Sequence, residues 1–240
     1  MHTRRFTPIA GLLLALAATP LFAKDVITPA PAPAPAAKPE SAAPADYSTP
    51  KAAAKSFLDA VRRADTPAMK AAVFTPSDQL DAVDTFLTVL AAGTDLQKAA
   101  TTQFGADGTK SFGSVSSTAL QSRLAAIDAA EAHVTGDTAT IMLPADPATQ
   151  QSAGTILLKK IGTAWKLDGP ALFGLTPANA AQNAARLDLA KKLLKIDEEV
   201  SRDITAGKYT SASDAYQDYW TRSRLAAAPS ATAPSTRRSN

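Results

Sequence analysis

Cysteine is absent from this 240-residue chain, and its absence excludes several kinds of chemistry at once. Without cysteine there is no disulfide, no thiolate metal site, no cysteine nucleophile and no lipidated cysteine of a bacterial lipoprotein. Histidine is scarce too, because His133 is the only copy after residue 2. A zinc site needs several convergent His, Cys or carboxylate ligands. We therefore predict no metal, no cofactor and a fold stabilised by its core.

Net charge is small as well. The chain carries +3, but Arg4 and Arg5 lie in a segment that we expect to be removed, which leaves 23 basic against 22 acidic residues. A nearly neutral surface with scattered charges offers no electrostatic footprint for nucleic acid or an anionic membrane. We therefore expect neither as a partner.

Residues 1–23 have the three zones of a cleavable secretory signal peptide. These are a charged start, an apolar run from Ile9 to Ala18 and a small-residue end at Leu21-Phe22-Ala23. The run is about half the length that spans a bilayer, so the mature chain is expected to have no membrane anchor. The sequence predicts an exported protein, periplasmic or secreted, that starts at Lys24. The pair Arg4-Arg5 lacks the rest of a twin-arginine motif, which favours ordinary secretion.

Two low-complexity stretches flank the part of the chain that can fold. Residues 24–48 are rich in Pro and Ala, which favours an extended, disordered linker. Residues 226–240 are rich in Ala, Pro, Ser and Thr and are predicted to be a disordered tail. The intervening residues suffice for a sizeable core, and we divide them into an α+β domain at 49–172 and a C-terminal helical extension at 173–225.

Three helix starts follow one another at the beginning of this domain. Thr49-Pro50 predicts a helix over about 50–64, Asp65-Thr66-Pro67 a short helix through Val73, and Thr75-Pro76 a longer third helix. The third is expected to end or bend near Gly93 and to resume towards Phe104. Glycines at 105, 108 and 113 predict a loop, and residues 119–127 a further short helix.

After this helix, apolar and polar residues alternate one by one, which is the pattern of a β-strand. Residues 130–135 and 138–143 alternate around Gly136-Asp137, and residues 154–161 and 164–168 flank Gly162-Thr163. Two β-hairpins, and hence an antiparallel sheet of about four strands, are predicted. The chain is then helical again from Thr176, with an apolar stripe over Leu189–Ile204, and residues 211–225 are expected to fold back as a helical hairpin.

The order of these elements resembles the nuclear transport factor 2-like superfamily, the cystatin-like α+β cone, in its bacterial exported form. Three stretches carry the resemblance: the helix Thr49–Ala60, the turn Val134–Ile141 and the hairpin Leu158–Leu167. It covers residues 49–172 and implies N-terminal helices packed on a curved antiparallel sheet, with the C-terminal helices as an addition. Members of that superfamily use the cone for catalysis, for binding or for dimerisation, so the fold does not decide the function.

Isomerase-type members of the superfamily place an Asp base and an oxyanion hole of Tyr and protonated Asp in an apolar cavity. The four tyrosines of this chain all lie outside residues 49–172; they are Tyr47, Tyr209, Tyr216 and Tyr219. The tyrosine that the oxyanion hole requires is therefore missing from residues 49–172, and we predict no catalytic residue.

Other candidates for chemistry have structural explanations. His133 and Glu131 form an acid/base pair on paper, but they share the polar face of a strand and are expected to face solvent. Asp78, Asp81 and Asp84 fit a solvated helix face better than a calcium site. No phosphate-binding loop or nucleophile elbow occurs.

Aromatic side chains are few. Trp165 is expected in the core. Tyr216, Tyr219 and Trp220 form a group that either docks on the chain's own helix or forms an interface, and the sequence favours neither.

The leading hypothesis is therefore a non-catalytic exported module that binds a small ligand or a protein. The first alternative is a cone-cavity enzyme of isomerase or hydrolase type with unidentified acid/base residues. The second is a structural protein that assembles through its C-terminal helices, with a homodimer among the partners left open.

Overall fold

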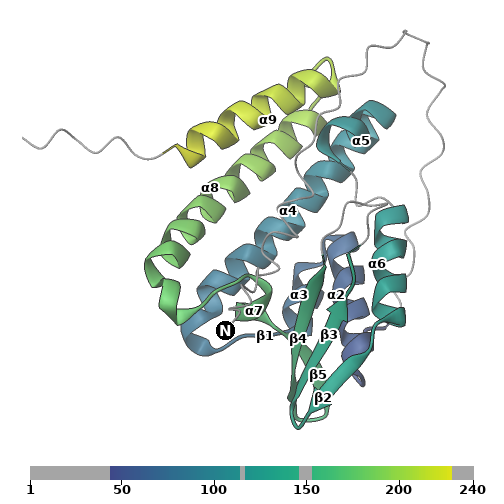
Figure 1. Ribbon diagram of the computed structural model, residues 1–240. Coiled ribbons are helices and arrows are strands. Elements are labelled where there is room, and N and C mark those ends of the chain that lie inside the picture. Colours follow the sequence, from purple (N-terminus) through teal and green to yellow (C-terminus); the bar gives the residue numbers. More distant parts are fainter. Residues whose placement is uncertain (1–43, 114–116, 146–152, 229–240) are drawn as a thin grey trace, which may run out of the picture.

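The computed structural model describes residues 44–113, 117–145 and 153–228, and this part of the chain is an α+β fold. Within it are eight α-helices and a mixed, open sheet of five strands in the order β1-β5-β4-β3-β2 (Figure 1). The predicted signal peptide, most of the Pro/Ala linker and most of the tail lie outside the described residues.

The first half of the described chain supplies most of the helices that pack on the sheet. Its elements are α2 (Pro50–Arg63), α3 (Thr66–Ala72), β1 (Val73–Phe74), the 3-10 turn η2 (Ser77–Gln79), α4 (Leu80–Phe104), α5 (Ala106–Phe112) and α6 (Ser117–Ala129). The remaining elements are β2 (Ala132–Thr135), β3 (Thr138–Leu143), β4 (Gly154–Ile161), β5 (Ala164–Asp168), α7 (Gly169–Leu172), the 3-10 turn η3 (Pro177–Asn179), α8 (Ala180–Thr205) and α9 (Ala212–Ala227).

The predicted helix caps of α2 and α3 are confirmed. Thr49 Oγ1 accepts the Ala52 amide at 3.2 Å, and Asp65 Oδ1 accepts the Ala68 amide at 3.0 Å. Each cap satisfies an amide that has no partner within its helix. At the third predicted start, Pro76 has no capping side chain, and the chain passes through η2 before α4 begins.

Two helix predictions around the glycines are wrong in part. α4 runs unbroken through Gly93, because burial of residues such as Leu87 and Leu96 on either side outweighs the roughly 1 kcal/mol cost of a helical glycine. The segment predicted as a loop forms α5, between Gly105 and Gly113, both of which have positive φ. Gly108 lies inside α5, where a Cβ would overlap the Ala100 carbonyl of α4.

Both predicted hairpins are confirmed, but the sheet has a fifth strand that makes it mixed. β1 pairs in parallel with β5, through Val73 opposite Leu167, where the sequence predicts the end of a helix. β1 has two residues, which are too few to show the alternation of a strand, and its partner β5 lies in a distant part of the sequence. The sheet is therefore neither four-stranded nor wholly antiparallel.

One face of the sheet carries the first hydrophobic core. Ile141, Leu158, Trp165 and Leu167 point to this face and pack against buried residues of α2, α3 and α4, among them Phe57. The predicted core position of Trp165 is confirmed, with 6% of its surface exposed. The opposite face is open to solvent, with Met142 62% and Leu157 43% exposed.

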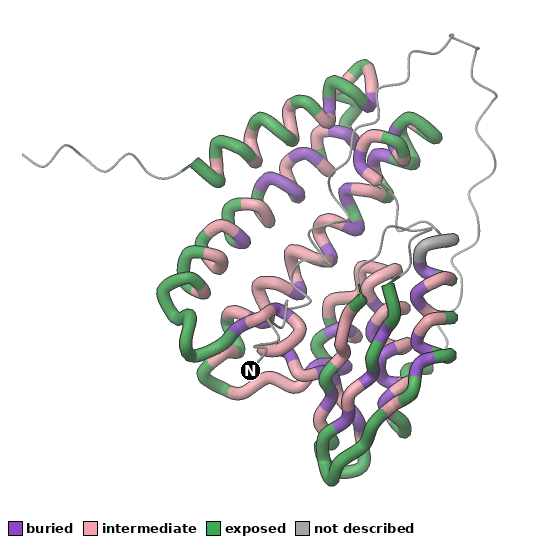
Figure 2. The backbone as a smooth tube through the Cα atoms, in the orientation of Figure 1, coloured by how far each residue is buried: buried purple, intermediate pink, exposed green. Residues whose placement is uncertain are grey.

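The alternation predicted for the first strand holds only in part. Val134 pairs with Ala139 on the core-facing side, yet it is 54% exposed. β2 is the edge strand, and Figure 2 shows that the ends of the hairpins are largely exposed, beyond the helices that cover the rest of the face.

A second hydrophobic core joins the C-terminal helices to the far half of α4. It contains Leu96, Ala100, Phe112, Ile196, Val200, Ile204 and Ala215, from α4, α5, α8 and α9. The long helices α4, α8 and α9 lie side by side (Figure 1). The apolar stripe predicted over Leu189–Ile204 is therefore largely covered within the chain itself. Among the described helices, none combines the length and the apolar character required to cross a membrane.

Candidate functional site

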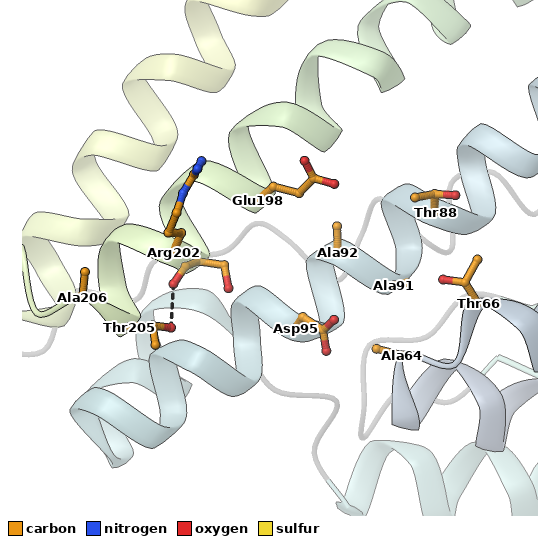
Figure 3. Close-up of a pocket in the computed structure, with 11 residues that line it drawn as sticks. Ala64, Thr66, Thr88, Ala91, Ala92, Asp95, Glu198, Arg202, Thr205 and Ala206 are labelled. Carbon is orange, nitrogen blue, oxygen red and sulfur yellow. Dashed lines mark hydrogen bonds between the residues drawn. The ribbon is translucent and has the colours of Figure 1, made fainter.

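A groove with a volume of about 630 Å³ lies where α4, α8 and the turn between α2 and α3 meet. We call it the α4–α8 groove. Its walls are lined by Ala64, Thr66, Thr88, Ala91, Ala92, Asp95, Glu198, Ser201, Arg202, Thr205 and Ala206. Figure 3 shows Asp95 extending from α4 and Glu198 from α8 on the two sides of the groove.

Small side chains leave this groove open. The α4 wall consists of Thr88, Ala91, Ala92 and Asp95, and the spacing i, i+3, i+4, i+7 places all four on one helix face. The α8 wall repeats the same spacing over 198, 201, 202 and 205. Alanine, serine and threonine do not reach across the space between two long helices, so a space remains where Leu or Phe would fill it.

The third wall depends on a single backbone conformation. Ala64 ends α2 with a φ of 59°, in the left-handed region, and its amide donates to the carbonyls of Ala60 and Val61. This turn directs the chain into Asp65 and Thr66, which begin α3. Lys98 of α4 fixes the same corner, because its Nζ donates to the Arg63 carbonyl at 2.8 Å.

The groove presents mainly hydrogen-bond acceptors. Thr88 Oγ1 donates to the Asp84 carbonyl at 2.8 Å, and Thr205 Oγ1 donates to the Ser201 carbonyl at 2.9 Å. Each hydroxyl has thus used its donor within its own helix and keeps its lone pairs as acceptors. Asp95 is held by Lys98 at 3.4 Å, and Glu198 has no ion-pair partner within 4 Å among the described residues.

A buried carboxyl lies next to the groove but belongs to another interface. Asp197 is 4% exposed and contacts α9 through the Tyr219 hydroxyl. Burial raises the pKa of Asp197 to about 7, with the Tyr219 hydrogen bond opposing the increase and the Glu198 carboxylate adding to it. Because Asp197 does not line the groove, its raised pKa does not place an acid or base there.

The predicted pair of Glu131 and His133 lies on the outer part of the structure. The two side chains are 4.0 Å apart and are 82% and 58% exposed. This is a solvated contact on an edge strand, far from an enclosed space, and agrees with the structural explanation given by the sequence.

We expect His133→Ala to leave the midpoint of thermal unfolding and any ligand binding nearly unchanged. An exposed side chain contributes little to folding, and an exposed ion pair is worth at most about 1 kcal/mol. Thermal unfolding followed by circular dichroism, together with native mass spectrometry of the variant, checks this. A drop of several degrees, or loss of a bound small molecule, contradicts it.

Of the three aspartates predicted to lie on a solvated helix face, two lie on α4 and pair with different lysines. Asp81 pairs with Lys191 of α8 at 3.1 Å, and Asp84 pairs with Lys70 of α3 at 2.7 Å. Asp78 precedes α4 and belongs to η2. Among the described residues, no group of three or more His, Cys, Asp or Glu side chains converges as a metal site would require.

The aromatic group of α9 is divided between core and surface. Tyr216 and Tyr219 pack on Phe112 of α5, with ring centroids 5.6 and 5.9 Å apart respectively. Trp220 is 46% exposed. Two of the three side chains thus dock on the chain's own helices. Tyr47, which the sequence assigns to the linker, also packs against the first core, and its carbonyl accepts the Trp165 amide at 2.8 Å.

The groove is the feature that the sequence prediction missed. In the sequence, the groove corresponds to two sets of small and charged residues, each with the spacing i, i+3, i+4, i+7. Alanine-rich helices contain many such sets, so this pattern alone does not predict a groove. The chain matches no protein-family model, no curated protein and no solved structure.

Proposed function

We propose that this chain is an exported, non-catalytic module that binds a small ligand in the α4–α8 groove. The observation that carries the proposal is the open space between two helices whose facing positions are small, hydroxyl-bearing or charged. A packed helix pair in a purely structural role would fill such a space with larger apolar side chains.

The chemistry of the walls favours a ligand that donates hydrogen bonds. Thr88, Thr205, Asp95 and Glu198 supply acceptors, and Glu198 has no competing partner within 4 Å among the described residues. Arg202, which also lines the groove, adds one positive charge. We therefore propose a small polar ligand with a cationic or donor-rich group in preference to an apolar one.

The overall architecture is proposed to be that of the nuclear transport factor 2-like cone. In support, helices α2, α3 and the start of α4 pack on one face of a sheet that contains two consecutive hairpins. The space between this sheet and these helices is occupied by core residues such as Phe57, Leu158 and Trp165. This is why we place the ligand in the groove and not inside the cone.

Catalysis is a less favoured alternative. An acid or base in a cone-cavity enzyme needs an ionisable group in an enclosed, apolar space. The carboxyl with the most strongly raised pKa, Asp197, faces α9 instead of the groove or the sheet. Assembly through the C-terminal helices is supported by one observation, the exposed Trp220 on α9.

Native mass spectrometry of the protein purified from its own host extract tests the proposal. Export predicts that the intact mass corresponds to residues 24–240. The binding proposal predicts a monomer or dimer that carries an additional small-molecule mass. A clean, ligand-free oligomer instead supports assembly through the C-terminal helices and contradicts the small-ligand proposal.

A further inference from the structure

Asp197 is placed where an ionised carboxyl is costly. It lies on α8 beside Ile196 and one turn before Val200 and Ser201, with 4% of its surface exposed. Its Oδ1 is buried and has no hydrogen-bond partner among the described residues. The Tyr219 hydroxyl of α9 is the group that hydrogen-bonds to the carboxyl. A buried carboxylate with one hydrogen bond is far less favourable than its neutral form.

The charged groups of the neighbouring elements do not compensate this carboxyl. On α8 itself, Glu198 is also negative. On α9, Arg222 is engaged by Glu199 at 3.3 Å, by Asp218 at 2.7 Å and by Asp203 at 3.8 Å. On α4, Lys98 pairs with Asp95. Other ionisable side chains on the helices that meet in the second core include Lys195, Glu198, Glu199 and Asp203 of α8; Tyr216, Asp218, Tyr219 and Arg222 of α9; Asp95 and Lys98 of α4; Asp107 and Lys110 of α5.

We propose that the Asp197 carboxyl makes the docking of α9 on α8 sensitive to pH, so that α9 is held while this carboxyl is neutral and is released when it ionises.

α9 is the element that gives way because, among the described residues, it packs mainly on α8 and α5, and its ion pairs to α8 all run through the single side chain of Arg222. It is the last described helix and packs on α8 and α5 through Ala212, Ala215, Tyr216 and Tyr219. Its outer side is exposed, with Leu225 71% exposed. By contrast, α8 is also held by α4 along its length. Release of α9 therefore exposes Phe112 and the part of α8 that α9 covers, without unfolding the sheet.

The sign of the effect follows from linkage. The docked state binds the Asp197 proton more tightly than the released state, where the carboxyl meets water and recovers an ordinary pKa of 3.8. Docking is consequently strongest in acid, weakens as pH rises above the ordinary pKa and reaches its minimum above the raised pKa. Between about pH 5.5 and about pH 8.5 the opening equilibrium of α9 is expected to increase roughly thirtyfold.

Hydrogen exchange of the full mature chain tests this proposal. The readout is the protection of α9 amides divided by that of α2 amides in the same molecule, so that the pH dependence of the exchange chemistry cancels. In the wild type this ratio is expected to fall about thirtyfold between about pH 5.5 and about pH 8.5. In Asp197→Asn, which keeps the shape and loses the titration, it is expected to change less than about threefold. A constant ratio in the wild type, or an equal fall in both proteins, overturns the proposal.

A second variant keeps the test decisive if Asp197→Asn does not fold. Tyr219→Phe removes the hydrogen bond to the ionised carboxyl and retains the ring packed on Phe112. The fall in the α9 to α2 ratio is then expected to be steeper than in the wild type, because the ionised state has lost its one stabilising contact. A shallower fall contradicts the assignment of Asp197 as the titrating group.

Discussion

Leu158→Ala is expected to lower the free energy of unfolding by about 2–5 kcal/mol, and Leu157→Ala by less than about 1 kcal/mol. The two leucines are neighbours in β4 and point to opposite faces of the sheet. Leu158 is 1% exposed and packs in the first core, whereas Leu157 is 43% exposed. Truncation of Leu158 leaves a cavity among Ala139, Leu167 and the helices, while truncation of Leu157 removes atoms that already contact water.

Urea unfolding of the two variants measures this difference, with the midpoint and slope recorded for each. Because the two substitutions have the same chemistry and nearly the same position in the strand, each is a control for the other. Equal destabilisation, or a larger loss from Leu157→Ala, would mean that the outer face of the sheet is covered in solution and would contradict the assigned faces.

Gly108→Ala is expected to destabilise the protein by about 2–3 kcal/mol, whereas Gly93→Ala is expected to stabilise it by about 0.5–1 kcal/mol. Both glycines lie inside helices. A Cβ at Gly108 would overlap the Ala100 carbonyl of α4, which is backbone and cannot rotate away. A Cβ at Gly93 meets no heavy atom within 4 Å. The first substitution therefore forces α5 off α4, and the second only restricts the unfolded chain.

The two variants carry the same Gly→Ala substitution, and their expected changes in stability have opposite signs, so each is a control for the other. Thermal unfolding gives the change in stability, and the near-ultraviolet circular dichroism, to which Tyr216 and Tyr219 contribute, reports a change in the aromatic packing around Phe112. If Gly108→Ala is neutral, the close approach of α5 and α4 is wrong. Destabilisation by Gly93→Ala would mean that another group lies beside Gly93, where the structure has open space, and would contradict the structure there.

The parts of the fold that the sequence predicts are those with local signals. Thr49 and Asp65 cap their helices through amides three residues away, so a short stretch of sequence suffices. The two hairpins rest on Gly136 and Gly162, which have positive φ in two-residue turns between alternating strands. In each case the residues that decide the structure are close neighbours in the chain.

The parts that the sequence does not predict depend on distant contacts. Val73 is a strand residue because Leu167 lies beside it, and no periodicity can show this. Gly108 is helical because α4 supports α5, although three glycines in nine residues favour a loop. Propensity is a weak preference, and tertiary packing overrides it at both places.

In the candidate site, too, the local features can be predicted from the sequence and the distant contacts cannot. Its residues were visible as helix faces, and Asp197 was visible as a carboxylate four residues after Leu193 and three before Val200. Which faces meet, and which of them leave a space, is decided by the placement of α8 on α4. That placement brings Ala92 and Ser201 to one groove from positions more than a hundred residues apart.

Retention of a small molecule by two matched tryptophan variants is the sharpest test of binding in the α4–α8 groove. Ala92→Trp fills the α4–α8 groove, and Ala125→Trp adds the same side chain at an exposed position of α6, outside it. Both are purified from the host beside the wild type and examined by native mass spectrometry. If the ligand binds in the groove, the additional mass is present in the wild type and in Ala125→Trp and is lost in Ala92→Trp. An additional mass that persists in Ala92→Trp, or that is missing from the wild type, contradicts binding in the groove.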